Sequence, residues 1–264
     1  MSTVGDGYRF FLLRLGVSVR FTVVGGCGAW PAAGQACSGY VVEAEGFRVL
    51  VDPGYATLPR LLGRMRADEV DAVLVTHGHP DHCADLNPLL RARALADVPA
   101  PALPVYAPPG ALDAVLALDN RRMLAGSFVT HDLGPGVPYE IGPFRLDAFD
   151  LPHHVPNAGL RLSAGGRVIA YTGDTGPSPE LVALAEGADL LVAEATYPER
   201  VPEEDAPYLS SALDAGRTAA AAGVARLLLT HLWPDTSPGP ALTAAAKSYD
   251  GTLAVASEGV TLDL

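Results

Sequence analysis

The chain has 264 residues, of which 49% are hydrophobic, and its 18 basic and 30 acidic side chains give a formal net charge of −12. This length is enough for one large domain with a complete core or for two small domains. The acidic balance disfavours a long nucleic-acid footprint, because phosphate backbones are repelled at long range. It does not exclude a small anionic substrate, since a metal site carries positive charge of its own.

The three cysteines have no regular spacing, which argues against a disulfide framework and fits a reducing compartment. The N-terminal stretch "YRFFLLRLGVSV" is apolar, but two arginines interrupt it and no small-residue cleavage site follows. It is too short to span a membrane and lacks the features of a signal peptide. We therefore expect a cytoplasmic protein that does not associate with membranes.

Short β-rich runs alternate with segments in which apolar residues have helical spacing. The sequence predicts strands within 19–25, 38–44, 47–54, 71–77, 139–153, 158–175, 189–197 and 225–233. It predicts helices within 57–67, 86–96, 110–120 and 211–224. This order fits two packed sheets with helices on the outside, so that polar side chains gather where strand ends converge.

A dense group of metal-binding residue types follows the apolar run "VLV" in "VLVTHGHPDH". Zinc prefers imidazole nitrogen and carboxylate oxygen, and a catalytic zinc site keeps one position open. Because residues two apart on an extended segment point the same way, His77 and His79 can bind one ion. Asp81 and His82 then face a second position nearby. The spacing therefore favours a metal site with two positions.

Four side chains cannot complete two ions, so further ligands must come from elsewhere. His231 ends "LLLTH", a near copy of "VLVTH", and Asp174 is exposed by the turn in "YTGDTG". In "LPHHVPN", strand alternation sends His153 and His154 in opposite directions, so we expect one of them to bind metal. His131 follows in "VTHDLGPG", where we expect a solvated loop.

The His-x-His-x-Asp-His motif in "THGHPDH" resembles the signature of the metallo-beta-lactamase superfamily, and in particular its ribonuclease Z-like branch with the bacterial metal-dependent hydrolases. The resemblance runs from about residue 19 to the C-terminus, through "HHVPNAGLRL", "IAYTGDTG", "LLVAEATY" and "LLLTHLW". It implies an α/β fold of the four-layer αββα sandwich type. We therefore expect a single domain over 1–264, with 1–18 as an N-terminal extension.

The resemblance also implies two metal ions, each held by three side chains, with one carboxylate shared between them. The implied ligands are His77, His79 and His153 for the first ion, Asp81, His82 and His231 for the second, and Asp174 as the bridge. The six-residue step from His153 to Gly159 favours His153 over His154. The expected ions are zinc, with manganese or iron as alternatives, and Asp81 and Asp174 are the expected catalytic residues that orient the metals and the nucleophile.

Two departures from ribonuclease Z bear on the substrate. Those enzymes carry His-Glu-Ala-Thr where this chain has "AEAT", and His-Ser-Thr where it has "LSS", so Ala193 and Leu209 stand at the histidine positions. Both histidines associated with proton transfer in RNA cleavage are therefore missing. No long basic insertion that could hold a tRNA is visible either. We infer that tRNA maturation is not the function of this chain.

The leading hypothesis is a dinuclear zinc hydrolase of small phosphodiesters, in which water activated by the two ions attacks phosphorus. The same centre could cleave an ester, thioester or lactam carbonyl. A hypothesis of another class is a metal-binding sensor or scaffold without catalysis. Glu194, at a strand end, either supports the ligands or handles protons. The expected partner is a small-molecule substrate, and a homodimer is compatible with the family.

Overall fold

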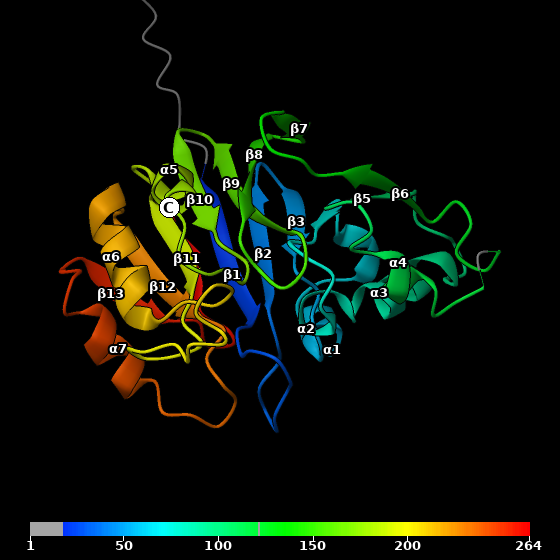
Figure 1. Cartoon of the computed structure of the whole chain (residues 1–264). Helices are drawn as coiled ribbons and strands as arrows, with labels where there is room; N and C mark the ends of the chain where they lie inside the picture. Colours follow the sequence, from blue (N-terminus) through cyan, green and yellow to red (C-terminus); the bar gives the residue numbers. More distant parts are fainter. Residues whose placement is uncertain (1–17, 121) are drawn as a thin grey trace, which may run out of the picture.

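The computed structural model describes residues 18–120 and 122–264, so the predicted N-terminal extension lies outside the described residues except for its last position. Two seven-stranded sheets face each other across the centre of the molecule, and helices cover their outer faces (Figure 1). Within the described part of the chain, no helix is long and apolar enough to cross a membrane.

The first sheet has the strand order β14-β1-β2-β3-β4-β5-β6. Its strands are β14 (Thr261–Asp263), β1 (Val19–Gly25), β2 (Gly39–Ala44), β3 (Phe47–Val51), β4 (Ala72–Leu74), β5 (Leu103–Ala107) and β6 (Phe128–Asp132). The helices that pack on it are α1 (Thr57–Leu62), α2 (Pro80–Cys83), α3 (Leu86–Ala94) and α4 (Asp113–Leu116), and a 3-10 turn, η1, spans Ala67–Glu69.

The second sheet has the order β13-β12-β11-β10-β9-β8-β7. Its strands are β13 (Thr252–Val255), β12 (Arg226–Thr230), β11 (Leu190–Glu194), β10 (Arg167–Tyr171), β9 (Asn157–Ala164), β8 (Phe144–Leu151) and β7 (Tyr139–Ile141). The helices on its outer face are α5 (Glu180–Ala185), α6 (Ala212–Ala222) and α7 (Gly239–Ala245).

Three apolar clusters separate these layers. Phe21, Leu74 and Leu160 belong to the cluster between the two sheets, which large buried side chains fill. A second cluster joins the first sheet to α1, α3 and α4, and a third, rich in alanine, joins the second sheet to α5, α6 and α7. The predicted four-layer αββα sandwich is therefore confirmed.

The sheets carry their polar strand ends to one place because of strand direction. In the first sheet β3, β4 and β5 pair in parallel, and in the second sheet β10, β11 and β12 do so. The strand β8 pairs antiparallel with β9, and β9 pairs antiparallel with β10, so β8 runs in the same direction as β10. The carboxyl ends of these strands therefore lie along one edge of each sheet, which is where ligands bind in α/β folds.

Local signals explain several boundaries. Ser211 caps the start of the helix α6, since its hydroxyl accepts a hydrogen bond from the Asp214 backbone N–H, and Gly223 caps the end of the helix in the left-handed region. The predicted helix 57–67 ends earlier, at Leu62, with Gly63 as its C-cap residue. The separate turn η1 follows, and at its start the Glu69 carboxylate accepts a hydrogen bond from the Arg66 N–H. The predicted helix 110–120 shortens to α4.

One sequence prediction about a histidine was wrong. His131 does not lie in a loop but in the edge strand β6, where it pairs with Tyr106 of β5 and stacks on its ring. The glycines and prolines that suggested a loop begin only after this strand, at Gly134. The side chain is exposed, as expected, and it lies apart from the histidines described below.

The packing of α3 generates a stability prediction. Leu89 on this helix is fully buried, whereas Leu95 at its C-terminal end is 58% exposed. We expect Leu89→Ala to lower the free energy of unfolding by about 2–5 kcal/mol and Leu95→Ala by less than about 0.5 kcal/mol. Urea denaturation at one fixed zinc concentration checks this, because bound metal itself adds stability. Equal losses in the two variants would contradict the assigned core.

Candidate metal centre

The motif "THGHPDH" turns sharply at the end of β4. Val75 and Thr76 follow the strand, His77 and His79 lie on the same loop, and Pro80 begins the single-turn helix α2. A side chain at Gly78 would approach the Ala111 carbonyl oxygen to 2.7 Å, so only glycine fits there. This tight path brings four polar side chains of one short segment to the space between the two sheets.

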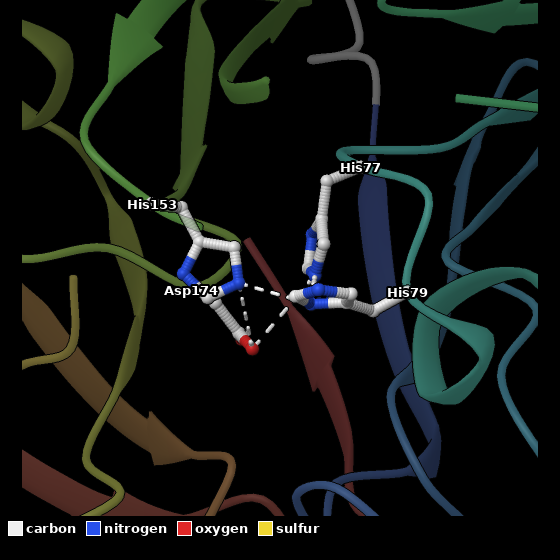
Figure 2. A group of neighbouring side chains, drawn as sticks. All are labelled: His77, His79, His153 and Asp174. Carbon is white, nitrogen blue, oxygen red and sulfur yellow. Dashed lines mark hydrogen bonds and ion pairs between the residues drawn. The ribbon is translucent and has the colours of Figure 1, made fainter. Parts of the chain in front are cut away.

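The first cluster consists of His77, His79, His153 and Asp174. One ligand atom from each of these side chains lies within 4.8 Å of the others. The Nδ1 atom of His79 is 3.1 Å from Nε2 of His77 and 3.1 Å from Nε2 of His153. Figure 2 shows the three rings and the carboxylate pointing toward one another from separate segments of the chain. Such a concentration of nitrogen lone pairs matches the ligands that zinc prefers.

The second cluster consists of Asp81, His82, Asp174 and His231, all buried, with ligand atoms again within 4.8 Å of one another. The Nε2 atom of His231 is 3.1 Å from Oδ2 of Asp81 and 3.1 Å from Oδ2 of Asp174. Its backbone has a φ of 62°, and Asp52, described below, has a φ of 49°. Non-glycine residues in this region are strained, and such strain concentrates at functional sites.

Asp174 belongs to both clusters. Its carboxylate lies after β10, with Oδ1 3.2 Å from Nε2 of His82 and Oδ2 3.9 Å from Nε2 of both His77 and His153. The preceding Gly173 has a φ of 58° and packs against Asn157 and Thr76. A carboxylate in this position can contact ions in both clusters at once.

Four of the histidines have their Nδ1 atom held by an acceptor. Thr76 Oγ1 donates its hydrogen to Asp52, so it accepts the Nδ1–H of His77 at 3.0 Å. The backbone carbonyl of Tyr208 accepts from Nδ1 of His153 at 2.9 Å. The acceptors for His82 and His231 are Oδ2 of Asp52, at 2.8 Å, and Oγ1 of Thr196, at 2.9 Å. In each ring the Nε2 lone pair is then left to face the centre.

Two buried atoms make the need for a cation explicit. Nε2 of His82 and Oδ1 of Asp174 have no hydrogen-bond partner, although they lie 3.2 Å apart. When the His82 ring is neutral and donates its Nδ1–H to Asp52, both atoms present lone pairs to each other. Buried polar atoms without partners are costly, and a metal ion between them removes that cost. The residues present therefore fit a metal site.

The electrostatics lead to the same requirement. Burial lowers the pKa of His82, but Asp174 and Asp81 outweigh it and raise that pKa well above its usual value. Asp174 likewise overcomes burial at His231 and raises its pKa to about 9. Burial and the Asp174 carboxylate raise the pKa of Glu194 to about 8. The buried carboxylates thus need positive charge in the second cluster, which a divalent ion supplies with the histidines neutral.

Asp52, at the end of β3, was missed by the sequence reasoning. It is fully buried and accepts hydrogen bonds from the backbone N–H and hydroxyl of Thr76, both at 2.7 Å, and from the Tyr171 hydroxyl at 2.8 Å. With the bond from His82, four donors converge on one carboxylate. The only sequence signal was an aspartate between a buried strand and Pro-Gly in "VLVDPG", which also describes an ordinary turn.

Glu194 supports the second cluster from behind. It accepts hydrogen bonds from the Thr196 hydroxyl at 2.7 Å and from the Ser210 backbone N–H at 3.1 Å. Since Thr196 in turn accepts from His231, Glu194 positions that ring. Leu209, next to Ser210, is half-buried and Ala193 is buried in β11. His154 is exposed and packs on the Tyr208 ring, with centroids 4.3 Å apart, outside both clusters.

Comparison with known proteins places the chain in a family. The family model of the beta-lactamase superfamily domain matches residues 47–232. The probable metallo-hydrolase YhfI of Bacillus subtilis is 33% identical over 221 residues, which cover 81% of this chain and 87% of the relative. Ribonuclease Z of Haloferax volcanii is 28% identical over 304 residues, which cover 94% of this chain and 96% of that protein.

Solved structures agree. The crystal structure of the metallo-beta-lactamase fold protein YhfI from Bacillus subtilis matches with a TM-score of 0.85 and 29% identity, over 94% of this chain and 100% of that chain. Zn²⁺-bound PqqB from Methylobacterium extorquens has a TM-score of 0.73 at 19% identity, over 93% of this chain and 100% of that chain, and shares the fold. The predicted resemblance is thereby confirmed, and the chain belongs to the metallo-beta-lactamase superfamily of metal-dependent hydrolases.

Proposed function

We propose that the protein is a dinuclear zinc hydrolase that cleaves small phosphodiesters. The observation that carries this proposal is the shared position of Asp174 between two clusters whose imidazole lone pairs face inward. One carboxylate within reach of two sets of nitrogen ligands is the arrangement that a two-metal hydrolase needs. The zinc-bound PqqB structure with the same fold supports zinc as the ion.

The ligand assignment follows the two clusters. His77, His79 and His153 would hold one ion, Asp81, His82 and His231 would hold the other, and Asp174 would contact both. When bound, two such ions lower the pKa of water and stabilise the attacking and leaving oxygens of a phosphoryl displacement.

The chain's own residues then have defined tasks. Asp52 and Thr76 fix the tautomers and orientations of His82 and His77, and the backbone N–H of Ala29 donates to Oδ2 of Asp81 at 2.9 Å, which fixes that carboxylate. Asp81 and Asp174 would thus orient the ions and the water molecule that they activate. Carboxylates and imidazoles held in this way lose little freedom on metal binding.

Two observations support small phosphodiesters rather than precursor tRNA. Relatives named ribonuclease Z act on phosphodiester bonds of RNA, so the two clusters suit that reaction class. Ala193 and Leu209, however, cannot donate a proton to a poor leaving group, and a general acid contributes about 10²–10⁴-fold in rate. The net charge of −12 also opposes docking of a long polyanion, an effect that salt weakens.

The adjacent histidines at the end of β8 provide a test of the ligand set. His153→Ala removes a ring whose Nε2 is 3.1 Å from Nδ1 of His79, whereas His154→Ala removes a ring that packs on Tyr208 and belongs to neither cluster. We expect the first variant to lose about one zinc ion per chain and most activity, and the second to keep both. Metal analysis of the purified variants checks this. Similar metal loss in both variants would contradict the assignment.

Asp52 generates a prediction about metal affinity. Asp52→Asn removes the charge that accepts from His82 and Tyr171 but keeps a residue that tolerates a positive φ. We expect zinc affinity to fall about 10–100-fold, as measured by competition with a chromophoric chelator. Asp147→Asn, which breaks an exposed pair with Arg145, is the control and should leave the affinity unchanged. An unaltered affinity in Asp52→Asn would show that this carboxylate does not support the metal.

The proposed reaction is tested with two substrates at low salt. We expect zinc-loaded protein to hydrolyse bis(p-nitrophenyl) phosphate, because nitrophenolate leaves without a protein acid, and to leave precursor tRNA uncut. Removing zinc with a chelator should abolish the hydrolysis, and adding zinc should restore it. Efficient cleavage of precursor tRNA would refute the argument from Ala193 and Leu209. Zinc-loaded protein that ignores both substrates but hydrolyses a nitrophenyl ester would replace phosphodiesters with carbonyl substrates.

A further inference from the structure

Two cysteines lie side by side at the ends of the loop between β1 and β2. An isolated β-bridge pairs Cys27 with Cys37. Both thiols are free, and the two residues are only 8% and 0% exposed. A hydrogen bond between the thiols lowers the pKa of Cys27 and, together with burial, raises the pKa of Cys37. The two side chains therefore meet in the interior, as the partners of a disulfide must.

The chain allows the two segments to approach closely. A Cβ atom at Gly25 would lie 2.1 Å from the Cys37 carbonyl oxygen, so only glycine fits there. The Cys27 thiol donates to the Ala36 carbonyl oxygen at 3.0 Å, which places its sulfur against the segment that carries Cys37. The sulfur atoms of a disulfide are about 2.05 Å apart, much closer than two thiols in contact. Forming the bond therefore draws Cys27 toward Cys37.

The opposite side of Cys27 is paired with the chain that carries a ligand of the second cluster. A second isolated β-bridge joins Cys27 to Leu232, the residue after His231. The Gly28 N–H donates to the Leu232 carbonyl oxygen at 2.9 Å. Cys27 thus lies between Cys37 and the segment of His231. A movement of Cys27 toward Cys37 is a movement away from that segment.

The two residues after Cys27 contact the second cluster directly. A Cβ atom at Gly28 would lie 2.7 Å from Nδ1 of His231, so the backbone here packs on the imidazole ring. The Ala29 N–H donates to Oδ2 of Asp81 at 2.9 Å, from a backbone with a φ of 60°. A non-glycine residue in this region is strained and keeps its conformation only while its surroundings enforce it. Both contacts therefore depend on the position of Cys27.

A small oxidant has a path to one of the two thiols. Cys27 lines a cavity of about 290 Å³, and Gly34, Ser257 and Glu258, which are exposed, also line it. Cys37 is not part of this wall. The arrangement gives an accessible thiol with a second thiol behind it, which is how redox-sensing cysteines are paired with a resolving cysteine.

We propose that Cys27 and Cys37 form a reversible disulfide that weakens zinc binding at the second cluster. This inference rests on the proposed function, because it names a regulation of the same metal centre. The oxidant is a peroxide. In reducing compartments such a disulfide is transient and reports on oxidants.

The oxidation has two steps. The Cys27 sulfur attacks one oxygen of hydrogen peroxide, the O–O bond breaks, and the other oxygen leaves as water, so that Cys27 becomes a sulfenic acid. The Cys37 sulfur then attacks the Cys27 sulfur, the S–O bond breaks, and a second water leaves. The peroxide gains two electrons, the two thiols lose them, and both thiol hydrogens end in water.

Thiol counts and mass spectrometry test the bond itself. We expect hydrogen peroxide to lower the number of thiols titrated after denaturation of zinc-loaded protein from three to one. Trypsin releases both cysteines in one peptide, 21–48, which should lose two hydrogen atoms and resist alkylation. A phosphine reductant should restore all three thiols. Cys83→Ala, which removes the third cysteine, should form the bond as the wild type does, and Cys27→Ala should not.

Zinc affinity tests the coupling to the second cluster. We expect one of the two zinc ions to bind about 10–100-fold more weakly to the oxidised protein than to the reduced protein, as measured by competition with a chromophoric chelator. The phosphine reductant should restore the affinity. Cys27→Ala treated with the same peroxide is the matched control and should keep its affinity.

The outcomes separate this inference from the proposed function. Failure of the bond to form, or a bond that leaves zinc affinity unchanged, would overturn the inference and leave the phosphodiesterase standing. An equal loss of affinity in peroxide-treated Cys27→Ala would show that the oxidant acts elsewhere, and would also overturn it. A reversible loss of affinity in a protein whose reduced, zinc-loaded form does not hydrolyse bis(p-nitrophenyl) phosphate would support the disulfide and count against the phosphodiesterase.

Discussion

The contact between Asp174 and the inward-facing imidazoles is the constraint on which the rest of this molecule depends. A buried carboxylate that faces unshared imidazole lone pairs is unfavourable without a cation, so the surrounding chain has to make a cation site and hold it rigid. The sandwich provides this because parallel strands of both sheets end at the same edge, one sheet carrying His77 and the other Asp174 and His231. The large apolar layer between the sheets keeps these ends at a fixed separation.

The hydrogen bonds that orient His77 and His231 come from different places, although the two histidines follow similar strands. "VLVTH" and "LLLTH" look like copies, and in the first the threonine next to the histidine orients it, since Thr76 accepts from His77. In the second the adjacent Thr230 instead contacts the Tyr40 hydroxyl at 2.6 Å, and Thr196, two residues after β11, accepts from His231. The two strands therefore share a shape, while their hydrogen bonds were fixed separately by their neighbours in each sheet.

The sequence could predict what depends on local pattern and could not predict what depends on long-range contacts. The alternation of strands and helices indicated two packed sheets, and the family resemblance of the ordered motifs implied the αββα sandwich and the seven residues that the fold brings into two clusters. Asp52 was missed because its hydrogen-bond partners Thr76, His82 and Tyr171 lie up to 119 residues away in the sequence. Its neighbouring residues also resemble an ordinary turn. His131 was misplaced because an exposed edge strand has no apolar alternation to reveal it.

The two clusters identify a class of reaction but not a substrate, and the loops around them explain why. The clusters require the same donor atoms for any phosphoryl or acyl transfer, so their geometry identifies a reaction class. The loops that hold Trp30 and Leu209 contact these side chains through backbone groups, since the Ala29 N–H donates to Asp81 and the Tyr208 carbonyl accepts from His153. The side chains of Trp30 and Leu209 themselves belong to neither cluster. Side chains on these loops bear on the choice of substrate, whereas the two clusters between the sheets bear on the class of reaction.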